Sequence, residues 1–389
     1  MCESKGACSA FRAAEKRYQV RQDVVTRQAN GRRRRMGFAE RPVDLTDVLD
    51  PQSGAQHPGV TELSGVPFPP SLAARCCAFS FASHPGLLLI RSALDPSFQR
   101  QLVMDALQLF CEPPNHTNHV AAYPNGLSGV WAAAQQGLRL QLDPPGAPEQ
   151  EPQQGRKAQA AASDGMWGRE GSGPEAESLL RRLRWATLGP QYDWTRRRYL
   201  QGEDGVAHMP LPPLLRQLAV SLADLAADLL TQHSDCRGRP EQAASTAFRP
   251  NAALINYYRP GDTLNGHRDD AECCLDKPLV SLSLGCDAIF LLGGTTRDVA
   301  PTALLLHSGD ALVLCGPARR CYHGVPRVLT DRPLPPAMRC CDSRGVGGDD
   351  GADGSSGEAG RRVGANHPFL PFERHMRCCR INISIRDTL

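Results

Sequence analysis

Short segments rich in β-forming residues follow one another after residue 250, and this pattern constrains the fold more than any other feature of the sequence. The segments span 253–258, 279–284, 288–292, 303–307, 311–315 and 380–386, and Gly, Pro and Asp separate them. No helical run interrupts the chain between 280 and 316, which disfavours a parallel βαβ sheet. The sequence therefore predicts a mainly β, α+β fold whose core is an antiparallel sandwich or jelly roll with flanking helices.

Two helices are predicted before that region. A buried strand at 87–90 is followed by Asp95 as N-cap and Pro96 in the first helical turn. Leucines recur at helical spacing over about 212–232, which indicates a helix with one face against a core. No apolar run reaches the ~18 to 20 residues that a membrane-spanning helix needs, so we expect no contact with a membrane.

Positive charge is concentrated at the N-terminus. The whole chain has a net charge of 44 − 41 = +3, but residues 1–36 hold ten Lys and Arg against three Asp and Glu. The arginine run at 32–35 has three interpretations: a nuclear-import or phosphate-binding patch, part of an organelle presequence, or a solvated tail. We expect residues 1–80 to form a partly disordered basic extension, followed by one domain at 81–389.

Two stretches of that domain are predicted to be flexible insertions. Residues 144–178 are rich in Pro, Gln, Gly, Ala and Glu, and residues 342–364 are dominated by glycine. Such compositions supply too few large apolar side chains to offset the entropy of ordering the chain.

The fifteen cysteines include four adjacent pairs and no Cys-x-x-Cys. Neighbouring side chains point apart and cannot easily share one tetrahedral metal. The odd count, the chain length and the lack of an apolar signal segment favour reduced thiols. We therefore expect an intracellular protein, in the nucleus, cytoplasm or mitochondrion.

A His-x-Asp pair, His267 and Asp269, follows the predicted strand at 253–258 and a polar turn. In an extended segment both side chains project to one face. Together with a second imidazole they would form the two-His, one-carboxylate set that leaves positions open on Fe(II) for a co-substrate and oxygen. His323, which follows the strand at 311–315 and precedes a glycine, is the preferred third ligand.

The other histidines have simpler interpretations. A second His-x-Asp, His233 and Asp235, lies at the end of the predicted helix, where a solvated helix terminus is favoured. His307 is read as a turn or core residue, and His367 and His375 as surface residues.

The C-terminal segment RINISIR alternates between apolar and polar residues. With a period of two, the isoleucines face one side and Arg380, Asn382, Ser384 and Arg386 face the other. The polar face could be exposed to solvent. Beside an iron triad it would instead form a clamp for a short dianion, because the planar fork of arginine suits carboxylates. Asn256 and Tyr258 could add neutral hydrogen bonds.

The motifs NYYRPGDTLNGHRDDAE, SLSLGCDAIFLLGG, HGVPRVL and RINISIR together resemble the AlkB family of Fe(II)/2-oxoglutarate dioxygenases, most closely its eukaryotic AlkB homologue one branch. The resemblance covers residues 84–389 without the two insertions. It implies a double-stranded β-helix (jelly roll), in which His267, Asp269 and His323 bind iron. The family's 2-oxoglutarate site corresponds to Asn256, Tyr258, Arg380, Asn382, Ser384 and Arg386.

The resemblance also implies an activity. With 2-oxoglutarate and O2 as co-substrates, such enzymes oxidise a methyl group on a nucleobase of DNA or of RNA such as tRNA, and release succinate, CO2 and formaldehyde. A base must leave its stack to be reached, and aromatic side chains usually receive it. Trp131, Tyr192 and Trp194 are the candidates, and the arginines at 196–198 could contact phosphates. Pro190 stands where close relatives carry an aromatic residue.

Alternatives to each of these assignments exist. Tryptophans in this region could pack in the core, and three adjacent arginines could form a solvated face. The same iron site could act on a protein side chain, or the chain could be a non-catalytic nucleic-acid-binding protein. We expect a monomer.

Overall fold

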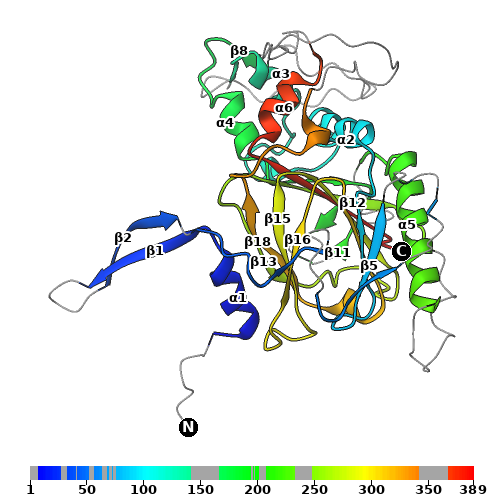
Figure 1. Cartoon of the computed structure of the whole chain (residues 1–389). Coiled ribbons are helices and arrows are strands. Elements are labelled where there is room, and N and C mark those ends of the chain that lie inside the picture. The colour runs from blue at the N-terminus through cyan, green and yellow to red at the C-terminus, as the bar shows by residue number, and fades with distance from the viewer. Residues whose placement is uncertain are drawn as a thin grey trace, which may run out of the picture.

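The computed structural model describes residues 8–27, 33–40, 42–51, 57–63, 68–69, 72, 76–141, 166–193, 196, 198–200, 207–232, 248–340 and 367–389, with side chains except at 21–40 and 230–232. Two β-sheets form the centre of the molecule, and helices cover the larger of them (Figure 1).

The larger sheet has eight strands in the order β4-β5-β6-β17-β14-β19-β12-β9. These strands are β4 (Val60–Leu63), β5 (Cys77–Phe81), β6 (Leu87–Arg91), β17 (Ala311–Leu314), β14 (Leu279–Gly285), β19 (Arg380–Arg386), β12 (Ala252–Tyr258) and β9 (Trp185–Leu188). Every neighbouring pair in this sheet is antiparallel.

The smaller sheet has five strands in the order β13-β18-β15-β16-β3. They are β13 (Leu264–His267), β18 (His323–Leu329), β15 (Asp287–Leu292), β16 (Thr302–Leu306) and β3 (Val48–Leu49). Only the short pairing of β16 with β3 is parallel among the described strand pairs of this sheet. The antiparallel two-sheet core confirms the predicted architecture, and each predicted strand agrees with the observed one to within a residue at either end.

Alternation along the strands distributes side chains between three apolar clusters. In β19, Ile381, Ile383 and Ile385 join the cluster between the larger sheet and the helices. In β15, Phe290 joins the cluster between the two sheets, whereas Ile289 points to the outer face of the smaller sheet. The polar side of β19 therefore faces the space between the sheets.

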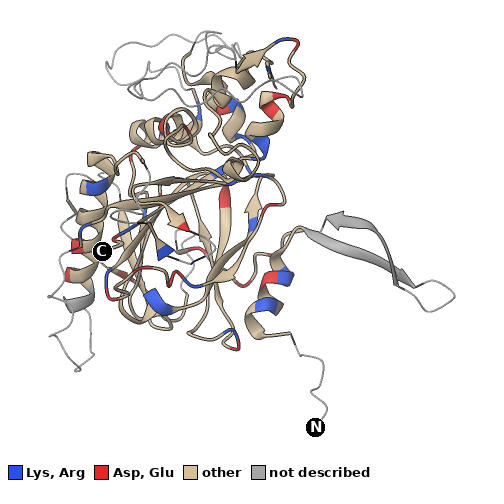
Figure 2. Ribbon diagram, turned by 180° about the vertical axis from the view of Figure 1, so that it is seen from behind, with Lys and Arg blue, Asp and Glu red and all other residues tan. Residues whose placement is uncertain are grey.

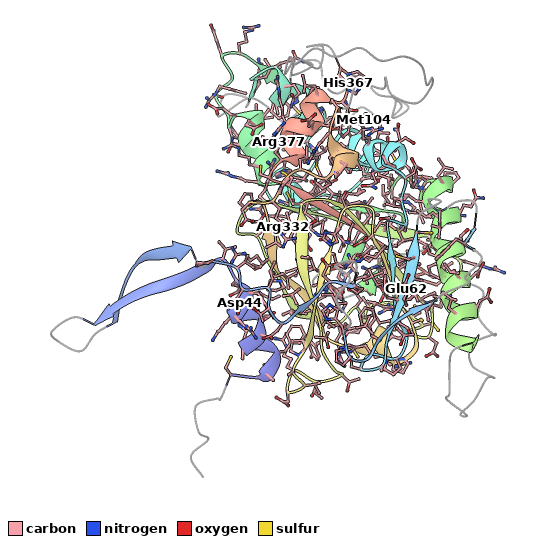
Figure 3. All side chains as sticks on the ribbon, viewed as in Figure 1. Asp44, Glu62, Met104, Arg332, His367 and Arg377 are labelled. Atoms are coloured by element: carbon pink, nitrogen blue, oxygen red, sulfur yellow. The ribbon has the colours of Figure 1, made fainter. Side chains whose placement is uncertain are left out.

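Helices cover the outer face and one end of the larger sheet (Figure 1). They are α2 (Pro96–Gln108), α3 (Val130–Gln135), α4 (Ala176–Arg181), α5 (Pro213–Gln232) and α6 (Leu370–Met376), with short 3-10 turns η2 (Asn118–Ala121), η5 (Gly316–Arg320) and η6 (Pro336–Met338). The Asp95 carboxylate accepts hydrogen bonds from Ser97 N–H and Phe98 N–H, so the predicted N-cap of α2 is confirmed. Figure 3 labels Met104 and Arg377 in the group of helices at the end of the sheets. In the described part of the chain, none of the helices has the length and apolar character required to span a bilayer.

Described parts of residues 1–80, where we expect a basic extension, pack on the core instead. Helix α1 (Ala10–Tyr18) packs on the outer face of the smaller sheet, where Phe11 is fully buried. Strand β3 joins the smaller sheet, and β4 and β5 join the larger one. The correction has a simple cause: α1 and β3 supply Phe11, Tyr18 and Val48 to an apolar face that would otherwise be exposed to water. Strands β1 (Arg21–Arg27) and β2 (Arg33–Glu40) pair as an antiparallel hairpin.

The first predicted insertion is too long at its C-terminal end. Residues 142–165 lie outside the described part, but 166–178 include β8 (Trp167–Gly168), which pairs with β7 (Arg139–Leu140), and the start of α4. The indole N–H of Trp167 donates to the Ser128 carbonyl at 2.7 Å, which anchors this segment. The second predicted insertion, 342–364, lies outside the described residues.

Candidate active site

The structure brings the three predicted metal ligands together. His267 ends β13 and pairs with His323, which begins β18, while Asp269 lies two residues beyond the strand. Nε2 of His267 is 3.7 Å from Oδ1 of Asp269, and Nε2 of His323 is 3.6 Å from Oδ2. One donor atom from each residue lies within 4.8 Å of the other two, a separation that one cation could bridge.

Backbone carbonyls orient both imidazoles. Nδ1 of His267 is 2.9 Å from the Asn265 carbonyl, and Nδ1 of His323 is 3.2 Å from the Cys321 carbonyl. A carbonyl only accepts, so each Nδ1 carries the proton and each Nε2 keeps a lone pair. A metal-ligating histidine commonly donates its other N–H in this way. The donor set fits Fe(II) with open coordination positions.

Local electrostatics favour the protonation states that a cation needs. Burial lowers the pKa of His267, and the neighbouring His323 lowers it further, so the ring is neutral. Burial alone would raise the pKa of Asp269, but this pKa lies well below its usual range, and the Arg386 guanidinium is the largest of the groups that lower it. A neutral imidazole at His267 and an ionised carboxylate at Asp269 are therefore available at neutral pH.

A cavity of about 580 Å³ opens beside these ligands, between the two sheets. Its lining includes the three candidate ligands and all six residues predicted to hold 2-oxoglutarate: Asn256, Tyr258, Arg380, Asn382, Ser384 and Arg386. The polar face of β19 is thus turned toward the cavity, which excludes the interpretation of that face as exposed to solvent.

Arg380 is a buried cation whose hydrogen-bond partners are neutral. It is 1% exposed, and it donates to the Ser283 hydroxyl at 2.8 Å and to the Cys286 carbonyl at 3.4 Å. Its Nε has no partner among the described residues. Burial of a charge is costly without a counter-charge. The surroundings of Arg380 therefore fit a carboxylate of a bound diacid such as 2-oxoglutarate.

Arg386 has different surroundings, which the sequence did not reveal. Its Nη1 lies 2.9 Å from Oε1 of Glu272, and its Nη2 lies 3.4 Å from Oδ2 of Asp269. Glu272 also accepts from Arg319 at 2.9 Å, and Arg319 donates to the Asp269 carbonyl at 2.5 Å. These four side chains form a buried network behind the metal site. The only sequence signal for it is the acidic residue three positions after Asp269.

Neutral hydrogen bonds fix the remaining polar groups of β19. Asn382 donates to the Ser281 hydroxyl at 2.7 Å and to the Leu282 carbonyl at 3.0 Å, and its own Oδ1 accepts from Ser384 at 3.0 Å. Burial raises the pKa of Tyr258, so this phenol remains a hydrogen-bond donor. The cavity floor thus has fixed polar groups before any ligand enters.

The predicted base-binding residues divide into three cases. Tyr192, in β10 (Tyr192–Asp193), lines the cavity and meets Tyr199 of β11 (Arg198–Tyr199) edge to face, with ring centroids 5.2 Å apart. Trp194 lies outside the described residues, as does Arg197. The prediction for Trp131 is wrong: this side chain is 4% exposed and stacks on Phe372 with centroids 4.6 Å apart, because α3 packs against α6.

Other sequence interpretations also have outcomes. Trp185, read as a possible core residue, lines the cavity together with Thr187 and Pro190. His375, read as a surface residue, lies partly buried against Trp131, with ring centroids 5.1 Å apart. His307 is not part of the metal site, as predicted, and the second His-x-Asp lies outside the described residues.

Comparisons with known proteins agree with this site. Residues 150–386 match the family model of the 2OG-Fe(II) oxygenase superfamily. The chain is 31% identical over 386 residues to the DNA N(6)-methyladenine demethylase ALKBH1A of Arabidopsis thaliana, covering 97% of this chain and 96% of that protein. It is 29% identical over 325 residues to the tRNA demethylase abh1 of Schizosaccharomyces pombe, covering 82% of this chain and 85% of that protein. A shorter match, 43% identical over 93 residues, covers 24% of this chain and 43% of the alpha-ketoglutarate-dependent dioxygenase AlkB of Escherichia coli. The chain therefore belongs to the 2OG-Fe(II) oxygenase superfamily and, within it, to the AlkB family of dioxygenases, which use Fe(II), 2-oxoglutarate and O2.

Proposed function

We propose that this protein is an oxidative demethylase of methylated nucleobases in DNA or in RNA such as tRNA. One observation carries the proposal: the ligand set His267, Asp269 and His323 borders the same cavity as Arg380, a buried cation with neutral partners. Demethylation of DNA and of tRNA is the activity named for the two long relatives, and it supports a nucleic-acid substrate.

In this proposal the Nε2 atoms of His267 and His323 and the Asp269 carboxylate hold Fe(II). The bound metal supplies oxidative chemistry toward a methyl C–H bond that amino-acid side chains cannot perform. The contribution of the chain is to hold the donor atoms. The carbonyls of Asn265 and Cys321 fix the two rings, and Arg386 keeps the Asp269 carboxylate ionised.

For 2-oxoglutarate, we assign Arg380 as the cation that binds one carboxylate, with Tyr258 and Asn256 as neighbouring polar groups. Tyr258 pairs with Arg380, and Asn256 with Asn382, across the antiparallel register of β12 and β19, so all four lie on adjoining positions of one sheet. Asn382, Ser384 and Arg386 complete the proposed set.

For the substrate, we assign Tyr192 as an aromatic surface for a base that has left its stack, together with Trp194. Tyr192 borders the cavity that holds the candidate ligands, which supports this assignment. Figure 2 shows Lys and Arg interspersed with Asp and Glu over the described ribbon. Phosphate contacts would therefore be made by local groups, with Arg196 and Arg198 near Tyr192 as candidates.

The substrate class can be tested with a panel of methylated tRNA, methylated single- and double-stranded DNA, and a methylated peptide. Purified protein is supplied with Fe(II), ascorbate and 2-oxoglutarate, and modified nucleosides are measured by mass spectrometry. The proposal predicts loss of a methylated base from at least one nucleic acid and none by His267→Ala. Turnover of the peptide alone would favour a protein side-chain oxygenase. Binding of nucleic acid without turnover would favour a non-catalytic protein.

We also propose an intracellular location and a monomeric enzyme. Described cysteines such as Cys111, Cys286 and Cys379 carry free thiols, which supports a reducing compartment. A monomer would suffice for the proposed activity, because the three candidate ligands and the six proposed 2-oxoglutarate residues all line the cavity of a single copy. A fluorescent fusion of residues 1–60 distinguishes nucleus, cytoplasm and mitochondrion, and light scattering gives the mass in solution.

A further inference from the structure

We infer that the N-terminal helix α1 is a framework element of the metal site, and that Glu15 and Phe11 are positioning residues for His267. The inference rests on the proposed assignment of His267 as a metal ligand. Helix α1 lies against β13 and β18, the two strands that carry the candidate histidines (Figure 1, dark blue).

Strand β13 is held incompletely by its own sheet. It is the edge strand of the smaller sheet, and its register with β18 shifts between the pairs Leu264↔Val325 and His267↔His323. Such a bulge leaves some backbone N–H and carbonyl groups without hydrogen-bond partners in the neighbouring strand. In this position, side chains bind both backbone groups of Gly266: the Glu15 carboxylate accepts its N–H, and Arg297 donates to its carbonyl at 2.6 Å.

Glu15 is itself fixed. Its side chain is 1% exposed and pairs with Arg12 at 2.8 Å. Arg12 also donates to the Asn265 side chain at 3.2 Å, and the Asn265 carbonyl is the group that orients Nδ1 of His267. A continuous series of contacts therefore runs from α1, through residues 265 and 266, to the imidazole of His267.

Phe11 fixes the same segment by packing. A side-chain carbon at Gly266 would overlap the Phe11 ring, and one at Gly293 would approach it to 2.8 Å, so both glycines make room for this ring. The Phe11 N–H donates to the Arg297 carbonyl at 2.9 Å. The ring also lies 6.3 Å from that of Tyr322, the residue before His323. Helix α1 thus contacts the chain beside both candidate histidines.

Outer-shell contacts of this kind act on metal affinity. A ligand whose backbone can shift loses part of the fixed geometry that makes binding favourable, and loss of such contacts commonly costs 10- to 100-fold in metal affinity or activity. Glu15 lies 251 residues before Gly266 in the chain, so the N-terminal segment contributes to a site whose candidate ligands are His267, Asp269 and His323.

Metal binding by the full-length apoprotein tests the inference without turnover. Co(II) is titrated anaerobically and its d–d absorption gives the dissociation constant. Glu15→Ala, which removes the acceptor for Gly266 N–H, should raise this constant roughly tenfold or more. Glu15→Gln retains an acceptor oxygen and should remain within about twofold of the unmodified protein. Arg17→Ala is the matched control, because it removes ion pairs of α1 with Asp44 and Asp47 and leaves Gly266 untouched.

A second variant reaches the same contact from the opposite side. Gly266→Ala should weaken Co(II) binding by displacing Phe11, and Phe11→Leu in the same chain should restore part of the affinity. If Glu15→Ala does not fold, the comparison of Gly266→Ala with the double variant Gly266→Ala, Phe11→Leu tests the role of α1.

The possible failures are distinguishable. No Co(II) binding by the unmodified protein would overturn the assignment of the metal ligands themselves. Tight binding by the unmodified protein and an equal constant for folded Glu15→Ala or Gly266→Ala would overturn the role of α1 alone. An equal loss of affinity in Arg17→Ala would show that α1 acts only through stability, and would also overturn it.

Discussion

Nη2 of Arg386 lies 3.4 Å from Oδ2 of Asp269, so the last arginine of the C-terminal strand contacts the carboxylate of the candidate metal site. Arg380, on the same face of β19, has neutral hydrogen-bond partners among the described residues. The alternation of the C-terminal segment predicts one clamp with an arginine at each end. The structure gives them different surroundings, and their substitutions should therefore have different effects.

Replacing Arg380 should mainly weaken 2-oxoglutarate binding. Loss of a charge-assisted hydrogen bond costs about 1.5 to 3 kcal/mol, which corresponds to roughly ten- to hundredfold in the 2-oxoglutarate dissociation constant. Calorimetric titration of the Co(II)-loaded Arg380→Ala variant with 2-oxoglutarate measures this dissociation constant. Arg380→Lys keeps the charge and loses the planar fork, so its dissociation constant should lie between those of the unmodified protein and Arg380→Ala. Equal constants for all three proteins would exclude Arg380 from this role.

Replacing Arg386 should mainly reduce stability and metal affinity. Arg386→Ala leaves the buried carboxylates of Glu272 and Asp269 with less compensation, and breaking a buried ion pair in this way costs about 3 to 5 kcal/mol. The pKa of Asp269 should also rise, because Arg386 is the main group that lowers it. Urea unfolding and Co(II) titration measure the two effects. A second change, Glu272→Gln, should recover part of the lost stability, and no recovery would argue against this pairing.

The stability of the protein should fall as the pH rises toward 9, because of His307. Burial opposes protonation, but hydrogen bonds to Asp287 at 2.9 Å and Asp50 at 3.4 Å outweigh it and raise the pKa of His307 to about 9. Because the pKa of His307 is higher in the folded state than its ordinary value of 6.5, protonation of His307 stabilises the folded state. This contribution is complete below pH 6.5 and is lost as the pH rises through 9.

The free energy of unfolding, measured between pH 6.5 and 9.5, checks this prediction, and the His307 contribution should be roughly 3 kcal/mol. The His307→Gln variant is the control: it should be less stable near neutral pH and should lack this part of the pH dependence. Parallel curves for the two proteins would contradict the assignment.

Tyr192 and Trp131 should behave differently with the nucleic-acid substrate. Loss of a stacking side chain costs about 1 to 3 kcal/mol per base, so Tyr192→Ala should raise the KM for the substrate, whereas Tyr192→Phe retains the ring. Binding of 2-oxoglutarate should not change. Trp131→Phe should alter thermal stability and leave the KM unchanged, because this residue is packed on Phe372. A selective effect of Trp131 on the substrate KM would reverse this view.

The parts of the structure that the sequence predicted are those encoded by local patterns. The alternation in RINISIR places its arginines and isoleucines on opposite faces of β19, and His267 and Asp269 are only two residues apart. Contacts between distant segments could not be read in this way. The carboxylate of Glu15 binds Gly266 across 251 residues, and Glu272 meets Arg386 across 114, and neither pair leaves a periodic signal.

Aromatic residues show the same limit of local reasoning. A tryptophan can either stack on a base or fill a core, and the sequence does not distinguish the two. The packing of α3 against α6 places Trp131 in the core, whereas β9 places Trp185 at the cavity. The N-terminal 80 residues are basic on average, but Phe11, Tyr18 and Val48 place helix α1 and strand β3 on the outer face of the smaller sheet.

The coupled release of formaldehyde and succinate tests the central claim most directly. Purified protein with Fe(II), 2-oxoglutarate and O2 should release one formaldehyde for each succinate when a methylated nucleic acid is supplied. The Asp269→Asn variant, which keeps the shape of the side chain but lacks the carboxylate charge, should release neither above background. Formaldehyde release that continues without 2-oxoglutarate, or that is undiminished in Asp269→Asn, would contradict an enzyme built on these three ligands.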